Sequence, residues 1–185
     1  MVGFMGTGKS SIGIGLSKKL KFSHVDTDNE IEKKKNMRIK DIFQFYGENY
    51  FRELEQNLIM EILDKKEKTV ISLGGGSFLN IKIREKIKKN CVSIWLNADV
   101  DAIYQRLEKS KNTRPLFSKT KSKHALEVLL KKRNLIYQEA DIKINTENLK
   151  KKYLIEEIFN SDICIIFTVT IYLCFFKNFT VSLIL

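Results

Sequence analysis

The chain has 185 residues, of which 43% are hydrophobic, and this length and composition indicate one globular domain with a sizeable core. Its 33 basic and 22 acidic residues give a formal net charge of +11. The lysines are scattered, without the basic and aromatic stripe of single-strand binders, so we expect no nucleic-acid partner. The three cysteines lack zinc-site spacing and indicate a reducing compartment.

The first motif along the chain begins at residue 3. Residues 3–10 read Gly-Phe-Met-Gly-Thr-Gly-Lys-Ser, which matches the phosphate-binding loop pattern. Glycines let the backbone approach a polyphosphate, and a helix expected from about Lys9 to Leu20 would add the positive end of its dipole. We expect Lys9 to contact the β- and γ-phosphates and the Ser10 hydroxyl to hold Mg²⁺. A chance glycine-rich turn is the alternative interpretation.

Short apolar runs alternate with helical patterns along the rest of the chain. We expect strands at 22–26, 69–73, 91–96 and 141–145, and helices at 29–35, 39–46, 47–66, 81–89, 99–108, 123–139 and 148–159. This alternation predicts an α/β fold in which a parallel sheet is covered by helices on both faces. Because only Met1 and Val2 precede the phosphate loop, we expect the first strand to be truncated to a stub.

Two segments differ from the rest in composition. Residues 110–122 are polar and basic and contain the only proline, Pro115, so we expect a loop there. Residues 163–185 are apolar, carry Lys177 as their only charge, and are long enough to cross a bilayer as a helix. This tail is interpreted in three ways: as a membrane anchor, as a packed or strand-forming extension, or as a segment without an evolved role beyond the domain.

Two carboxylates follow the strand expected at 22–26. Asp26 and Asp28 would lie at its carboxyl end, which is where open parallel sheets bind ligands. One of them could hold Mg²⁺ through water, and the other could orient a hydroxyl or accept its proton during attack on a phosphate. Alternatively, the pair only caps the helix that follows.

Other candidate site residues are arginines and a second glycine-rich segment. Arg52 and Glu55 share a helix face, so the carboxylate can brace a guanidinium that grips an anion. Gly74-Gly75-Gly76 ends a buried strand and offers bare backbone N–H groups, or else forms a simple turn. Arg114 in the basic loop could close over ATP, and Arg133 could bind an anionic acceptor, although each could also be an ordinary solvated residue.

Taken together, these motifs resemble shikimate kinase in order and approximate spacing. The resemblance covers the phosphate loop, Asp26-x-Asp28, Phe51-Arg52-x-x-Glu55, Gly74-Gly75-Gly76, Arg114-Pro115-Leu116 and Arg133, and runs from Val2 to about Phe159. It implies a P-loop three-layer sandwich with a five-stranded parallel sheet whose first strand is central. It also implies ATP-dependent phosphorylation of the shikimate 3-hydroxyl, on the route to chorismate and the aromatic amino acids.

The resemblance also implies a role for each matching residue. It places ATP on Gly6, Thr7, Gly8, Lys9, Ser10, Ser11 and Arg114; shikimate on Asp28, Arg52, Gly74, Gly75, Gly76 and Arg133; and Mg²⁺ on Ser10 and, through water, Asp26. Lys9, Asp28 and Arg114 are the expected catalytic residues, with Asp28 as the base. Residues 1–160 would form the kinase domain, with its lid at about 110–122, and 161–185 would lie outside it.

Three features depart from the family pattern and two other functions stay open. The first strand is nearly absent, Phe117 stands where leucine is usual, and the tail is foreign to the family. The alternatives are a kinase for another small hydroxy acid such as gluconate, and a noncatalytic P-loop nucleotide-binding protein. We expect a monomer in the cytoplasm, or in a plastid if a targeting segment is missing, with membrane contact only through the tail.

Overall fold

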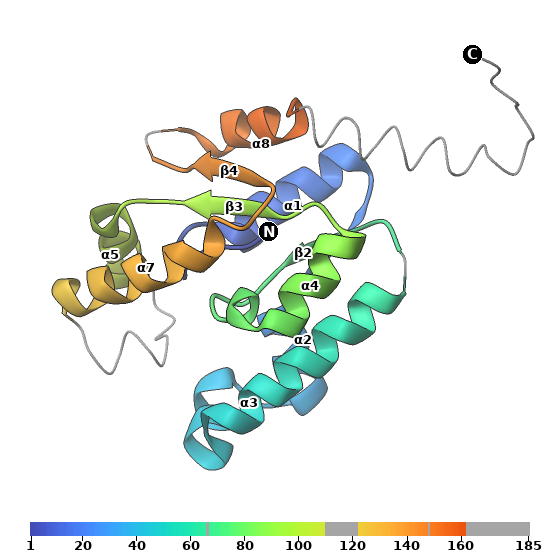
Figure 1. Ribbon diagram of the computed structural model, residues 1–185, viewed down its shortest axis with the longest axis vertical. Coiled ribbons are helices and arrows are strands. Elements are labelled where there is room, and N and C mark those ends of the chain that lie inside the picture. Colours follow the sequence, from blue (N-terminus) through green and yellow to red (C-terminus); the bar gives the residue numbers. More distant parts are fainter. Residues whose placement is uncertain (66, 110–121, 148, 162–185) are drawn as a thin grey trace, which may run out of the picture.

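The computed structural model describes residues 1–65, 67–109, 122–147 and 149–161 (Figure 1). Its helices are α1 (Lys9–Leu20), α2 (Thr27–Lys35), α3 (Ile39–Asp64), α4 (Ile81–Asn90), α5 (Val100–Lys109), α7 (Lys123–Tyr137) and α8 (Lys151–Phe159). Its strands are β1 (Ser23–Asp26), β2 (Thr69–Ser72), β3 (Ile94–Asn97) and β4 (Ile142–Asn145), and a 3₁₀ turn, η1 (Ser77–Leu79), follows the triple glycine. Arg114 and the tail at 163–185 lie outside the described residues.

The strands form two parallel pairs. β1 pairs with β2, and β3 pairs with β4, each over four residues in register. The N-terminal residues lie between the two pairs. On one side, Val2 N donates to the Ile94 carbonyl (2.8 Å) and Leu96 N donates to the Val2 carbonyl (3.0 Å). The N-terminal residues therefore lie next to β3, in the position predicted for a central first strand.

The other side of this N-terminal bridge is made by Met1. Its amine donates to the Ile71 carbonyl (2.6 Å), and Leu73 N donates to the Met1 carbonyl (3.1 Å). Burial lowers the pKa of the Met1 amine from 8.0 to about 5. The prediction of a continuous five-stranded sheet is not confirmed, because two residues supply only an isolated bridge, Val2 to Trp95, rather than a fifth ladder.

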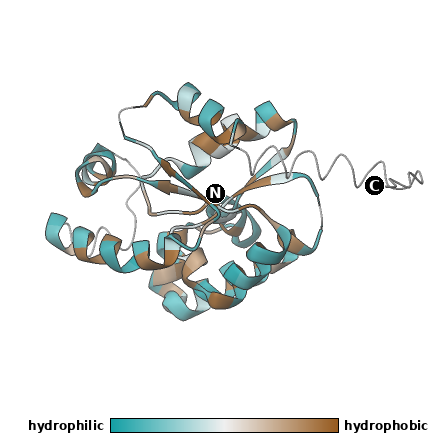
Figure 2. Ribbon diagram, turned by 45° about the horizontal axis from the view of Figure 1, so that its top comes forward, coloured by the Kyte–Doolittle hydropathy of each residue, from teal (hydrophilic) through white to brown (hydrophobic). Residues whose placement is uncertain are grey.

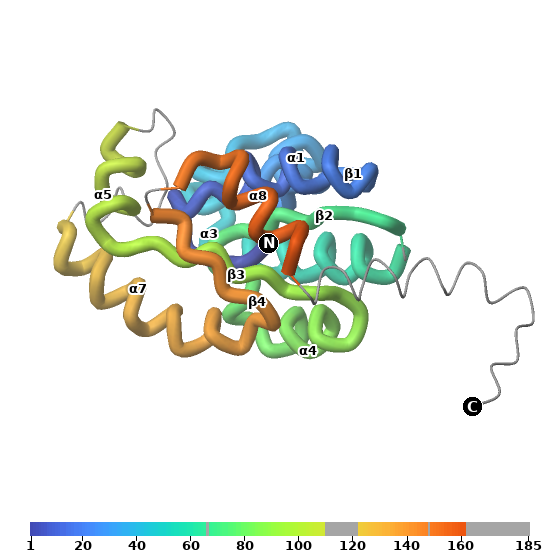
Figure 3. The backbone as a smooth tube through the Cα atoms, turned by 90° about the horizontal axis from the view of Figure 1, so that it is seen from above, coloured from blue at the N-terminus to red at the C-terminus, as the bar shows by residue number. Residues whose placement is uncertain are grey.

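Helices lie on both faces of the strands, as the views from two sides show (Figures 2 and 3). On β3, Ile94 and Leu96 join the core formed with α1 and α8. Trp95 points the other way and joins the core formed with α3, α4, α5 and α7. This period of two within one strand is what a sheet covered on both faces requires. The predicted layered α/β arrangement is confirmed.

The α2–α3 pair forms a third, smaller core that projects beside the strands (Figure 1). The helices predicted at 39–46 and 47–66 run on as α3, with a kink where Gly47 adopts φ 82° and ψ 174°. Such a positive φ favours glycine, because other residues carry a Cβ that clashes there. The segment after the kink carries Arg52 and Glu55, so the kink sets the direction in which they point.

The remaining predicted elements are found with small shifts at their ends. α1 has the predicted bounds and ends at Leu20, because the next residue, Lys21, has a left-handed φ of 56°. Asp99 caps α5 as predicted, since its Oδ1 accepts from Ala102 N (2.6 Å). Within the described ranges, none of the helices is both long and apolar enough to cross a bilayer.

Candidate active site

The phosphate loop curls around its own backbone before α1 begins. Gly6 and Gly8 have positive φ values of 79° and 94°, which a residue with a Cβ rarely adopts. The buried Thr7 hydroxyl donates to the Phe4 carbonyl (2.9 Å) and stabilises this curve. Lys9 Nζ donates to the carbonyls of Gly3 (2.8 Å) and Phe4 (2.7 Å), so its charge already lies over the loop.

Ser10 and Asp26 meet at the mouth of the loop. The Ser10 hydroxyl donates to Asp26 Oδ2, while Asp26 Oδ1 accepts from Asn29 N (3.2 Å) and caps α2. The two interpretations of Asp26, as a helix cap and as part of a metal site, are therefore compatible. A hydroxyl and a carboxylate are hard oxygen donors, and Mg²⁺ is usually held by one or two of these together with waters and phosphates. The pair fits the predicted metal, and Ser11 is exposed in the adjacent first turn of α1.

The triple glycine lies where charged side chains crowd the backbone. A Cβ on Gly74 would lie 2.6 Å from both Asp28 Oδ1 and Glu55 Oε1, and a Cβ on Gly76 would lie 2.5 Å from Arg52 Nη1. Glycine at these two positions leaves room for the carboxylates of Asp28 and Glu55 and for the guanidinium of Arg52. The structure brings together Asp28, Arg52 and the three glycines.

Arg52 is held between two glutamates of α3. Its Nη1 donates to Glu55 Oε2 (2.8 Å), and its Nε and Nη2 donate to Glu48 Oε1 (3.2 and 3.0 Å). Partial burial opposes the charge of Arg52, but the two carboxylates outweigh it and raise the pKa of the guanidinium. A cation so fixed is prepared for a planar anion such as a carboxylate.

Glu55 is the most buried acid of this group. Its side chain is only 2% exposed and also accepts a hydrogen bond from the Ser77 hydroxyl (2.7 Å). Burial raises the pKa of Glu55, while Arg52 and Ser77 oppose that rise. The Ser77 hydroxyl further lies 3.0 Å from the Gly74 carbonyl. This network joins α3 to the triple glycine, and the sequence offered no signal for the part played by Ser77.

Arg133 approaches the triple glycine from α7. Its Nη1 donates to the Gly75 carbonyl (3.0 Å), and its guanidinium carbon lies 5.2 Å from the centre of the Phe4 ring. The residue is buried, and its Nε has no hydrogen-bond partner among the described residues. A cavity of about 60 Å³ lies here, lined by Met5, Asp28, Ile39, Phe43, Phe51, Arg52, Glu55, Gly75, Gly76 and Arg133.

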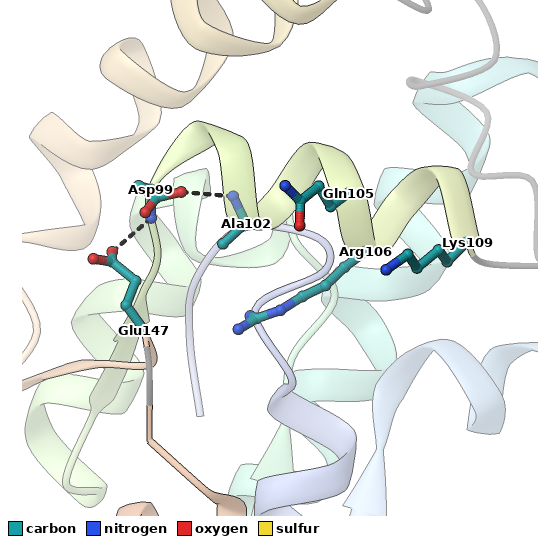
Figure 4. A pocket seen from close by; sticks show the side chains of 6 residues that line it. All are labelled: Asp99, Ala102, Gln105, Arg106, Lys109 and Glu147. Atoms are coloured by element: carbon teal, nitrogen blue, oxygen red, sulfur yellow. Dashed lines mark hydrogen bonds between the residues drawn. The ribbon is translucent and has the colours of Figure 1, made fainter.

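A second cavity, of about 220 Å³, lies beside the phosphate loop (Figure 4). It is lined by Asp99, Ala102, Gln105, Arg106, Lys109 and Glu147. Arg106 Nη1 donates to the Gly6 carbonyl (3.2 Å), and Nη2 donates to the Thr146 carbonyl (3.2 Å). The sequence did not indicate Arg106 as a site residue, because there it is one basic residue on an amphipathic helix. Arg114, the predicted lid residue, lies outside the described residues.

The layered α/β fold, the phosphate loop opening α1, and a charged cavity beside that loop together define a P-loop phosphotransferase. The shikimate kinase family model matches residues 5–162. The shikimate kinase of Rhizobium meliloti is 40% identical over 157 residues, which cover 85% of this chain and 81% of the relative. That of Persephonella marina is 41% identical over 158 residues, 85% of this chain and 94% of the relative.

A solved structure gives the same result in three dimensions. Shikimate kinase from Acinetobacter baumannii in complex with shikimate matches with a TM-score of 0.80 and 33% identity, over 85% of this chain and 88% of that one. The chain belongs to the shikimate kinase family.

Proposed function

We propose that this protein transfers the γ-phosphoryl group of ATP to the 3-hydroxyl of shikimate. The observation that carries the proposal is the cavity of about 60 Å³ at the triple glycine, where Asp28, Arg52, Gly75 and Arg133 meet. We call it the acceptor cavity. Two guanidiniums and two carboxylates line this small cavity, and one of the carboxylates, Glu55, already pairs with Arg52. This lining suits an acceptor that is both an acid and an alcohol. Arg52 and Arg133 would bind its carboxylate, and Asp28 its hydroxyls.

ATP would bind along the phosphate loop. Its phosphates would take the place of the Gly3 and Phe4 carbonyls as partners of Lys9, whose charge is already positioned over the loop. The cavity beside Arg106 is the nearest described space for the rest of the nucleotide, because Arg106 contacts Gly6 directly. Arg114 remains our proposed lid contact to ATP.

Mg²⁺ would be held by the Ser10 hydroxyl and, through water, by Asp26. When bound, it would neutralise charge on the β- and γ-phosphates. The direct hydrogen bond between these two side chains keeps both donors at the mouth of the loop. Because Asp26 also caps α2, the same residue fixes the start of the helix that carries Asp28.

Asp28 is the proposed base. It is half-buried in the first turn of α2. Its carboxylate lies close to Gly74, and the carboxylate of Glu55 lies close to the same glycine. Asp28 would orient the attacking hydroxyl and accept its proton as the bond to phosphorus forms. Phosphoryl transfer otherwise needs little covalent help from a protein, so catalysis would depend on positioning and charge neutralisation.

The proposal is tested by measuring ADP production by purified protein with ATP and Mg²⁺, with and without shikimate. Gluconate serves as the matched acceptor, because it is also a small hydroxylated acid. We expect turnover with shikimate and none with gluconate. Turnover with gluconate and none with shikimate, in a sample whose thermal melt shows a folded protein, would refute the assignment of shikimate as the substrate. ATP binding without turnover of either acceptor would refute the assignment of the protein as an enzyme.

We further propose that the kinase domain, about residues 1–160 with a lid at 110–122, acts as a monomer in the cytoplasm. The family match over 5–162 supports this domain end, and the free thiol of Cys91 is compatible with a reducing compartment. Size-exclusion chromatography with light scattering checks the oligomeric state.

A further inference from the structure

Tyr137 ends α7 behind the acceptor cavity and lies one helical turn after Arg133. Its side chain is buried, and the residue is only 1% exposed. The ring packs between Phe78 and Trp95, at centroid distances of 6.5 and 6.1 Å. Although buried, its hydroxyl has a hydrogen-bond partner, since it donates to the carbonyl of Gly75.

That carbonyl is shared with the proposed acceptor-binding arginine. Arg133 Nη1 donates to it as well (3.0 Å), so the two side chains, four residues apart on α7, contact one oxygen. A carbonyl oxygen has two lone pairs and can accept both bonds. The Gly75 oxygen is therefore the point at which α7, the triple glycine and Arg133 are joined.

The surroundings leave Gly75 little room to move. A Cβ on this residue would lie 3.2 Å from Met5 N, so its backbone packs directly against the phosphate loop. Burial also raises the pKa of Tyr137, with Arg133 opposing the rise, and the phenol keeps its proton and remains a donor. The guanidinium also lies over the Phe4 ring and interacts directly with the Tyr137 phenol, while its buried Nε has no partner in the described part of the chain.

We propose that Tyr137 is a positioning residue of the acceptor site, whose hydroxyl fixes the Gly75 carbonyl and thereby the guanidinium of Arg133. The inference rests on the proposed function, in which Arg133 binds the carboxylate of the acceptor. Without the hydroxyl, the carbonyl keeps only the Arg133 bond, and the guanidinium loses a fixed anchor. An acceptor carboxylate then meets an arginine that must be ordered on binding, which weakens binding.

The test is Tyr137→Phe, which removes the hydroxyl and keeps the ring between Phe78 and Trp95. We expect the KM for shikimate to rise about threefold to tenfold, the effect of one hydrogen bond, while the KM for ATP stays within about twofold. Phe78→Leu is the matched control, because it loosens the same ring packing and leaves the hydroxyl. It should lower the melting temperature and leave the KM for shikimate unchanged.

A double-mutant cycle with Arg133→Ala separates positioning from general stability. If Tyr137 acts through Arg133, Tyr137→Phe should change the KM for shikimate by less than about twofold once Arg133 is absent. Equal effects in both backgrounds, or an unchanged KM in Tyr137→Phe itself, would overturn the inference while leaving the proposed function intact. A folded wild-type protein that does not phosphorylate shikimate would overturn the proposed function, and this inference with it.

Discussion

Replacing Gly76 with alanine is expected to weaken binding of the acceptor and to leave the fold almost unchanged. Gly76 has φ −108° and ψ −15°, which alanine also adopts, so the backbone is not strained by the change. The added Cβ would instead lie 2.5 Å from Nη1 and 2.7 Å from Cζ of Arg52. Because the Arg52 side chain is 29% exposed, it can move away toward solvent.

The size of the effect follows from how far Arg52 must move. Ordinary contact begins near 3.4 Å, so the guanidinium has to shift by roughly 1 Å, a displacement that can cost about 100-fold in an active site. Hydrogen bonds to charged groups contribute about 1.5–3 kcal/mol each, or about tenfold to a hundredfold in affinity. We therefore expect the KM for shikimate to rise about 10- to 100-fold, with less than about 1 kcal/mol lost in stability.

The assay is steady-state ADP production at saturating ATP with shikimate varied, together with thermal melts. Gly15→Ala is the matched control, because its Cβ would lie 2.2 Å from Ile155 Cδ1, at the contact of α1 with α8 and away from the cavity. It should affect only the melt. If Gly76→Ala and Gly15→Ala change the KM for shikimate equally, the assignment of Arg52 to the acceptor site is wrong.

Three further outcomes are expected. Lys9→Ala should lower kcat by at least about 100-fold, because it removes a charge that stabilises the transferred phosphoryl group. The affinity for shikimate, measured by calorimetry, should stay the same, and weaker shikimate binding would contradict the assignment. Burial lowers the pKa of His24, whose Nε2 lies 3.0 Å from Ser72 Oγ. The unfolded chain therefore takes up a proton near pH 6.5 that the folded chain resists, so stability should fall as the pH drops below about 6.5. Thermal melts of His24→Asn should show a smaller loss of stability below about pH 6.5 than those of the wild type. An identical loss would exclude His24 as its source. Because the family match ends at residue 162, deletion of 163–185 should leave kcat and KM unchanged, and lost activity would show that the tail belongs to the working enzyme.

The sequence predicted those parts of the fold that depend on local patterns. α1 could be bounded because the glycine loop precedes it and its apolar residues recur at helical spacing. The strand expected from Cys91 starts only at Ile94, because pairing with β4 begins there, opposite Ile142. Just before it, Ser93 N donates to the Asp141 side chain (2.8 Å) instead of a neighbouring strand. Strand ends depend on the partner, which a local pattern does not contain.

The same limit explains which site residues could be predicted. Asp28, Arg52 and the glycines have recognisable neighbours in the sequence. Arg106, by contrast, is important because it contacts Gly6, 100 residues away, and Tyr137 because it contacts Gly75, 62 residues away. On their own helices both look like ordinary members of an amphipathic pattern. Only the folded chain shows the carbonyl oxygens that they contact.

The two strand pairs end at different parts of the proposed site. β1 and β2 end beside the acceptor cavity, whereas β4 ends just before Thr146, which holds Arg106 next to the phosphate loop. Within the sheet layer, the pairs are joined through Met1 and Val2, by four backbone hydrogen bonds. In the proposed function, this short bridge therefore helps to hold the acceptor cavity and the Arg106 side of the phosphate loop at a fixed distance from each other.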